Sequence, residues 1–179
     1  AESARAARKM GLTFSDLSLD PAALRRWSGS VVETLTKGID GLLKRRGVTV
    51  VRGWAQFLDN RTLEVSGAES ARIRFRHCIL ATGSDINRLP AGQTLPHWTT
   101  AEPLRLPEIP PRLLVVGGGY IGLEMGLVYA GLGSQVTMVE FFPRLLPGAD
   151  QDLVDVVVKS CERRFSRILT ESKVVDIQQ

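Results

Sequence analysis

The fold is decided by one stretch, Leu113-Leu-Val-Val-Gly-Gly-Gly-Tyr-Ile-Gly-Leu-Glu124. Its first four residues are apolar and predict a short strand that is buried on both faces. Gly117, Gly119 and Gly122 follow in G-x-G-x-x-G spacing, and residues 123–132 predict a helix. In such a turn the first glycine permits the tight bend, and the second lets a pyrophosphate approach the backbone. The third lets the helix pack closely on the strand.

The residues that follow place this glycine turn in a larger unit. Gly133 predicts the end of the helix, and Gln135–Val139 predict a second strand that leads directly into Glu140. An acidic residue about 20 positions after the glycines binds the adenosine ribose in NAD sites. Arg144 keeps NADP open as an alternative, and a glycine-rich turn without any ligand is the structural alternative. The sequence predicts a dinucleotide site that favours NAD.

Composition and charge argue against several other classes of protein. The chain has 179 residues, 44% hydrophobic and 23% charged, which is typical of a globular protein. No apolar run is long enough to span a bilayer, so we expect no membrane partner. The net charge of +4 is spread over many faces without a recognition motif, so we expect no nucleic-acid partner. Cys78 and Cys161 lie too far apart for a zinc or C-x-x-C motif, which predicts reduced thiols, no metal site and a cytoplasmic protein.

The first half of the chain predicts helices followed by short strands. Residues 1–10 favour a helix, and Asp20-Pro21 predicts the start of a long amphipathic helix that continues to about Arg46. This helix is a second candidate for function, because its apolar side could dock on a partner chain. The predicted strands are 48–51, 54–58, 62–65, 71–75 and 77–81, of which the middle three form a β-meander.

The second half contains a connection and the glycine turn. Residues 91–112 are rich in proline and predict a link between two lobes. Beyond Glu140, a helix from Asp150 to Arg164 and strands at 167–169 and 173–177 are expected. We therefore divide the chain into residues 1–90, a connection at 91–112, and residues 113–179.

Several segments together resemble the flavoprotein disulfide reductases, and among these most closely the bacterial dihydrolipoamide dehydrogenases. The segments that carry the resemblance are 35–39, 60–65, 79–84, 117–126 and 132–140. The resemblance implies an α/β fold with two dinucleotide-binding domains, each Rossmann-like and three-layered, with an inserted β-meander. Residues 1–90 would then be part of an FAD-binding domain and residues 113–179 part of an NAD-binding domain, both incomplete.

The resemblance also implies the cofactor contacts. Ala55 would lie against the adenine of FAD, and the segment Ala81, Thr82 and Gly83 would lie near its diphosphate and ribitol. Glu140 would hold the adenosine ribose of NAD, and Val174 would contact the adenine. The NAD pyrophosphate and nicotinamide side would be contacted by Gly117, Gly118, Gly119, Tyr120, Ile121, Gly122 and Glu124.

The activity implied by the resemblance is oxidation of dihydrolipoamide to lipoamide with reduction of NAD. The parent protein would be a homodimer and a partner of a 2-oxo-acid dehydrogenase complex. The family's own FAD motif, its redox cysteine pair and its C-terminal dimerisation domain are not found in this sequence. We therefore expect an internal segment with no catalytic residues and no turnover of its own. A stand-alone dinucleotide-binding module and an interaction fragment without redox activity are the alternatives.

Overall fold

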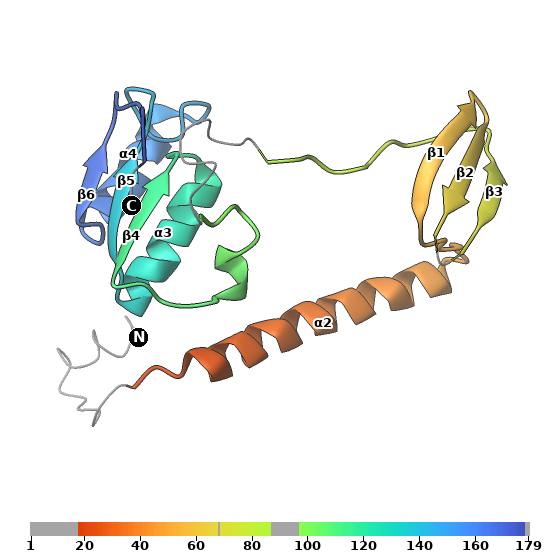
Figure 1. Ribbon diagram of the computed structural model, residues 1–179, viewed down its shortest axis with the longest axis horizontal. Coiled ribbons are helices and arrows are strands. Elements are labelled where there is room, and N and C mark those ends of the chain that lie inside the picture. Colours follow the sequence, from red (N-terminus) through yellow and green to blue (C-terminus); the bar gives the residue numbers. More distant parts are fainter. Residues whose placement is uncertain (1–17, 68, 87–96, 178–179) are drawn as a thin grey trace. The chain divides into compact units, whose positions relative to one another are not determined.

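The computed structural model describes residues 18–67, 69–86 and 97–177 (Figure 1). The chain divides into two compact units. One unit comprises Arg26–Asp85, and the other is formed by the residues before and after it. The helix expected at residues 1–10 lies outside the described residues.

The long helix α2 runs from Pro21 to Arg45, as the sequence predicts. Asp20 caps its first turn, because its Oδ1 accepts hydrogen bonds from the backbone N–H groups of Ala22 and Ala23 at 2.8 and 3.0 Å. Gly47 follows the helix with a φ of +66°, a conformation that costs glycine little. Helix α2 contains no buried residue: Leu24 packs partly against the core near its start, whereas Trp27, Leu35 and Ile39 further along are 57–66% exposed.

The β-meander is confirmed. Strands β1 (Trp54–Asp59), β2 (Thr62–Ser66) and β3 (Ala71–Arg74) form an antiparallel sheet in the order β1-β2-β3 (Figure 1). Val65 is buried on one face of this sheet, and the rings of Phe57 and Phe75 meet edge to face at 6.1 Å. The meander is therefore a small two-faced sheet with its apolar contacts on one side.

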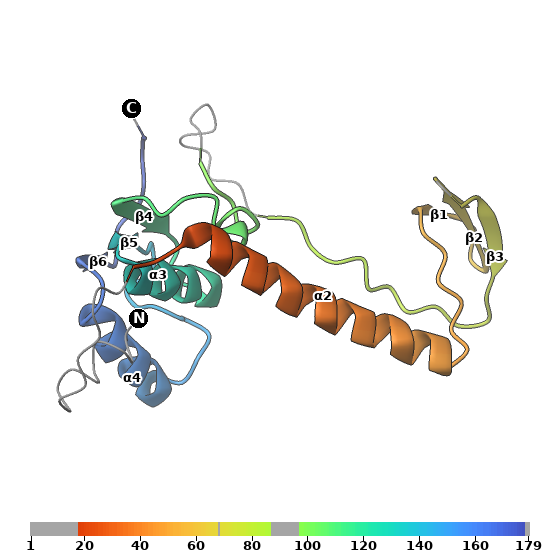
Figure 2. The ribbon, with the colours of Figure 1, turned by 90° about the horizontal axis from the view of Figure 1, so that it is seen from below.

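The glycine turn belongs to a parallel sheet. The elements are β4 (Arg112–Val116), α3 (Tyr120–Leu132), β5 (Gln135–Val139), α4 (Gln151–Glu162) and β6 (Arg167–Leu169). The strand order is β4-β5-β6 with every pair parallel, and Figure 2 shows both helices on one side of the sheet. This is the Rossmann-like α/β arrangement that the sequence predicts.

The core of this unit lies between the sheet and its helices. Tyr129, Val136, Met138 and Cys161 are fully buried there. The prediction that residues 113–116 are buried on both faces was wrong. Leu114 is 52% exposed, because α3 and α4 both cover the same face of the sheet and leave the opposite face open.

Three other predicted strands are not formed. Residues 48–51, 77–81 and 173–177 are not part of either sheet, and Ile79 and Leu80 are 92% and 69% exposed. An apolar run becomes a strand only when a neighbouring strand takes its hydrogen bonds. No described strand pairs with any of these three segments.

The proline-rich connection packs against α3 where the structure describes it. It contains one turn of 3-10 helix, η2 (Pro103–Arg105). The hydroxyl of Tyr129 donates to the carbonyl oxygen of Pro103 at 3.1 Å, and the hydroxyl of Ser134 donates to Pro110 at 2.6 Å. Trp98 also lies against the Tyr129 ring, with centroids 5.6 Å apart. The connection is thus held to the same unit as the glycine turn.

We expect Tyr129 to make the stability of this unit fall in alkali. Burial, and secondarily the charge of Glu108, raises the pKa of Tyr129 above its ordinary value of 10.0. The unfolded chain therefore loses this proton first, and the stabilisation, complete below about pH 10, is lost as pH rises through the folded pKa. Urea melts at pH 8 and pH 11 should show a larger loss for the wild type than for Tyr129→Phe. An equal loss in both proteins would contradict the role of Tyr129.

Candidate functional site

The glycine turn joins the carboxyl end of β4 to the start of α3. Gly117 has a φ of +106°, a left-handed conformation that favours glycine, and its N–H donates to Val139 of β5 at 2.8 Å. A Cβ atom at Gly122 would lie 2.2 Å from the carbonyl oxygen of Gly117 and 3.2 Å from a methyl group of Val115. Only glycine at position 122 lets α3 begin this close to β4.

Gly118 is fixed by its neighbours. Its N–H donates to Oε2 of Glu140 at 2.5 Å, and its carbonyl accepts from the N–H of Leu146 at 3.0 Å. A Cβ atom here would lie 2.4 Å from Cδ2 of Leu145, which is buried. Both polar backbone groups of Gly118 are thus already bonded within the protein.

Glu140 links the end of β5 to the glycine turn. It is 6% exposed, and its second carboxylate oxygen accepts from the N–H of Phe142 at 2.8 Å. Its backbone is held as well, because its N–H donates to Leu169 and its carbonyl accepts from Ser172. A carboxylate accepts about four hydrogen bonds. The hydrogen bonds from Gly118 and Phe142 use two of these positions.

The first turn of α3 offers unbonded donors beside this carboxylate. Within the described chain, the N–H groups of Tyr120, Ile121 and Gly122 have no hydrogen-bond acceptor. Gly119, directly before these donors, has no atom within 4 Å of the position where its Cβ would stand, so the space beside this residue is open. Unbonded N–H groups at a helix start carry partial positive charge and bind anions.

Other predicted contacts of NAD lie in the same unit. Tyr120 is 69% exposed at the start of α3, and Glu124 is exposed one turn later. Val174 is half-buried in the segment after β6. A hydrogen bond from the N–H of Gly118 thus joins the glycine turn to Glu140, whereas Val174 makes no hydrogen bond to either of them among the described residues.

Arg144 is occupied within its own loop. Its guanidinium donates to the carbonyl of Pro147 and to the side chain of Gln151, both at 2.6 Å. The bond to Gln151 ties the loop to α4, and Gln151 in turn donates to Asp155 of the same helix at 2.7 Å. Arg144 therefore uses donors of both terminal nitrogens to hold the loop that follows Glu140.

The residues predicted to contact FAD lie in the other unit, Arg26–Asp85. Ala55 is exposed on β1, and Ala81, Thr82 and Gly83 form an exposed segment without regular structure. Gly83 has a φ of +81° and no neighbouring atom within 4 Å of its Cβ position. This segment can admit a ligand to its backbone, but no enclosing wall is formed around it by the described residues.

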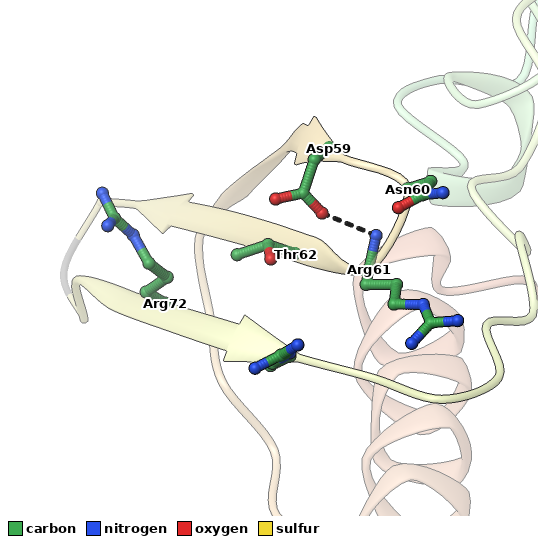
Figure 3. A pocket seen from close by; sticks show the side chains of 6 residues that line it. Asp59, Asn60, Arg61, Thr62 and Arg72 are labelled. Atoms are coloured by element: carbon green, nitrogen blue, oxygen red, sulfur yellow. Dashed lines mark hydrogen bonds between the residues drawn. The ribbon is translucent and has the colours of Figure 1, made fainter.

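A pocket also opens on the meander, at the turn between β1 and β2 (Figure 3). The N–H of Arg61 donates to Asp59 at 2.7 Å, and this bond in particular lowers the pKa of the Asp59 carboxyl below its ordinary value. Arg61 and Arg72 lie at opposite ends of the lining in Figure 3 and do not point toward one another. Asp59 therefore stabilises the turn, Arg72 pairs instead with Glu64 at 3.2 Å, and the two labelled arginines do not converge on an anion.

Sequence reasoning missed the contribution of the loop after Glu140. Leu145 packs against Gly118. The N–H of Leu146 donates to the carbonyl oxygen of Gly118, and Leu146 itself has a left-handed φ of +48°. In the sequence, the only indication of this contact is the apolar pair 145–146 between two prolines, a pattern that is equally typical of an ordinary loop. Its contact with the glycine turn depends on the parallel pairing of β4 and β5, which only the structure shows.

Comparison with known proteins identifies the family. Residues 2–179 match the family described as pyridine nucleotide-disulphide oxidoreductase. The chain belongs to this family. Among its relatives is the dihydrolipoyl dehydrogenase of Vibrio parahaemolyticus, 39% identical over 99% of this chain and 38% of the relative. The corresponding enzyme of Pseudomonas aeruginosa is 41% identical over 86% of this chain and 34% of the relative. The chain thus spans little more than a third of these proteins.

Solved structures are similar to this chain in fold. The HOCl-induced flavoprotein disulfide reductase RclA of Escherichia coli is 27% identical, with a TM-score of 0.75 over 90% of this chain and 37% of that chain. LpdA of Mycobacterium tuberculosis has a TM-score of 0.82 over 99% of this chain and 40% of that chain. Its identity of 21% means that it supports the fold alone.

Residues 18–67, 69–86 and 97–177 contain no cluster of three or more His, Cys, Asp or Glu side chains placed to hold a metal ion. In the same ranges no helix combines the length and hydropathy that crossing a membrane requires.

We expect the two cysteines to differ strongly in reactivity. Both are free, but Cys78 is exposed, whereas Cys161 is fully buried and burial raises its pKa. Alkylation by iodoacetamide at pH 8 should modify Cys78 at least about 100-fold faster than Cys161, which reacts only after local unfolding. Peptide mass spectrometry over time measures this ratio. Equal rates in the folded protein would contradict the packing of α4.

Proposed function

We propose that this chain carries the NAD site of an FAD-dependent oxidoreductase that converts dihydrolipoamide to lipoamide and reduces NAD. The observation that carries the proposal is the open row of N–H groups at 120–122 beside the buried carboxylate of Glu140. Relatives named dihydrolipoyl dehydrogenase support the reaction.

Within the NAD site each group has a separate task. The N–H groups of Tyr120, Ile121 and Gly122 bind the pyrophosphate, and the open space at Gly119 admits it. The remaining lone pairs of Glu140 accept from the adenosine ribose hydroxyls. Gly117 and Gly118 shape the turn.

The outer parts of NAD extend from this centre. Val174 lies on the adenine side, and Tyr120 and Glu124 lie toward the nicotinamide. Glu140 also favours NAD over NADP, because a buried carboxylate repels a 2′-phosphate and Arg144 is already bonded elsewhere.

For the FAD site we propose backbone contacts from Ala55 and from Ala81, Thr82 and Gly83. Their exposure and the open space at Gly83 fit a ligand that approaches the main chain. FAD, when bound, relays two electrons from the dithiol to NAD. In this proposal residues 1–90 belong to the FAD domain, 91–112 connect, and 113–179 belong to the NAD domain.

The whole protein is proposed to be a cytoplasmic homodimer that serves a 2-oxo-acid dehydrogenase complex. Thiol–disulfide exchange needs two cysteines that can reach each other. Cys78 and Cys161 are both free, and Cys161 is buried, where no second thiol can reach it in the folded protein. We therefore assign no catalytic residue within residues 1–179.

The second candidate function is a dinucleotide-binding module without redox activity. It is favoured by one observation, that the residues of the NAD site lie together in a single compact unit. An interaction fragment that docks through α2 is the third, and it rests on the open apolar side of that helix.

Calorimetric titration of the purified chain with NADH tests the site. We expect saturable binding that is much weaker for NADPH. The same chain, incubated with dihydrolipoamide, FAD and NAD, should form no NADH. Absence of saturation at millimolar NADH would refute the dinucleotide site, and measurable turnover would refute the placement of catalysis outside this chain.

A further inference from the structure

Two exposed aromatic rings follow Glu140 directly. Phe141 is 61% exposed and Phe142 is 50% exposed, although Glu140 before them and Leu145 after them are buried. Large exposed aromatic side chains at the edge of a site are typical ligand contacts. The hydrogen bonds of the NAD site proposed above leave both rings without a role.

The backbone that carries these rings is fixed. The N–H of Phe142 donates to the Glu140 carboxylate at 2.8 Å, and its carbonyl accepts from the N–H of Glu171 at 3.0 Å. The turn after β5 is therefore bonded on one side to the ribose-binding residue and on the other to the segment after β6. The backbone that carries the two rings is thus held in place by these hydrogen bonds.

The ring pair leaves stacking surface open. The two rings meet edge to face, with centroids 5.4 Å apart and planes at 78°. In this arrangement the edge of one ring covers one face of the other, so the remaining ring faces stay accessible. Phe141, the more exposed of the two, has the larger accessible surface.

We infer that Phe141 provides the stacking face for the adenine of the dinucleotide. This inference rests on the proposed NAD site. If Glu140 holds the adenosine ribose, the adenine is attached to that same ribose and must lie within a few ångströms of the carboxylate. Consecutive Cα atoms are 3.8 Å apart, so the ring of the next residue is in reach. Purine rings stack on aromatic side chains, and the carboxyl edge of a parallel sheet is where such ligands bind.

Titration of the full chain with ADP-ribose, by calorimetry, tests this assignment. Phe141→Ala should raise the Kd about 5- to 30-fold, the range expected for losing one base–aromatic stack. Phe141→Tyr keeps the ring and should bind like the wild type. Phe142→Ala is the matched control, because it removes a neighbouring ring of the same size and should change the Kd less than Phe141→Ala.

The outcomes separate the inference from the proposed function. If the wild-type chain binds neither NADH nor ADP-ribose, the dinucleotide site itself is refuted. If the wild type binds and Phe141→Ala binds equally well, or Phe142→Ala loses more, the stacking role of Phe141 is overturned. Should Phe141→Ala fail to fold, Phe141→Leu replaces it, since leucine keeps the apolar volume and removes the aromatic face. A Kd for Phe141→Leu equal to that of the wild type would also overturn the inference.

Discussion

Gly122→Ala is expected to destabilise the unit that contains the glycine turn by about 1–3 kcal/mol, the range for overpacking a close contact. The added methyl group would stand 2.2 Å from the carbonyl oxygen of Gly117, and a backbone atom cannot move aside as a flexible side chain can. The start of α3 would shift away from β4, and its N–H groups with it. NADH binding should weaken together with stability. Urea denaturation and calorimetry measure both.

The same helix offers a matched control. Gly131 also lies in α3, but no atom stands within 4 Å of its Cβ position. Gly131→Ala should therefore stabilise the unit by up to about 1 kcal/mol, because alanine favours a helix. The same glycine-to-alanine substitution is thus expected to lower stability at one position of α3 and to raise it at another. If both variants changed stability in the same direction, the close approach at Gly122 would be disproved.

Glu140→Ala should lower both the stability of the unit that contains the glycine turn and its affinity for NADH. The buried N–H of Gly118 and the N–H of Phe142 would lose their acceptors, each at a cost of about 1–3 kcal/mol. We expect NADH to bind about 10- to 100-fold more weakly, since hydrogen bonds to a charged group are lost. NADPH should lose less, because the repulsion of its 2′-phosphate also disappears. The NADH-to-NADPH ratio measured by calorimetry therefore separates a ligand contact from a purely structural role.

Two further variants complete this experiment. Glu140→Gln keeps one carbonyl acceptor at nearly the same side-chain volume. Its stability and its affinity for NADH should therefore lie between those of the wild type and those of Glu140→Ala. Glu162→Ala removes an exposed carboxylate of the same charge at the end of α4 and should change stability by no more than about 0.5 kcal/mol. An unchanged NADH-to-NADPH ratio in Glu140→Ala would exclude Glu140 from the ribose site.

The sequence predicted those elements whose determinants are local. The cap at Asp20, the meander turns and the glycine spacing act within a few residues, and α2, β1–β3 and the β4–α3–β5 unit are present as expected. The apolar runs 48–51 and 77–81 were misassigned, because pairing depends on a neighbouring strand that a run's composition does not reveal.

The sequence predicted which type of ligand the site would bind, but not the hydrogen bonds within the site. The spacing from Gly117 to Glu140 indicated a shared dinucleotide site. It did not indicate that Gly118 would give its N–H to Glu140, or that Leu146 would hold its carbonyl. Those bonds join a turn to residues more than 20 positions away, and they arise only once β4 and β5 are paired in register.

The bond between Gly118 and Glu140 has a consequence for the speed of binding. Because the protein's own hydrogen bonds hold the turn in shape at its centre, a ligand need not wait for the main chain to become ordered. Stopped-flow mixing with NADH should therefore give a single phase whose observed rate rises linearly with NADH concentration and reaches no plateau. In Glu140→Ala, where the turn is released, an ordering step should limit the rate at high NADH and produce such a plateau.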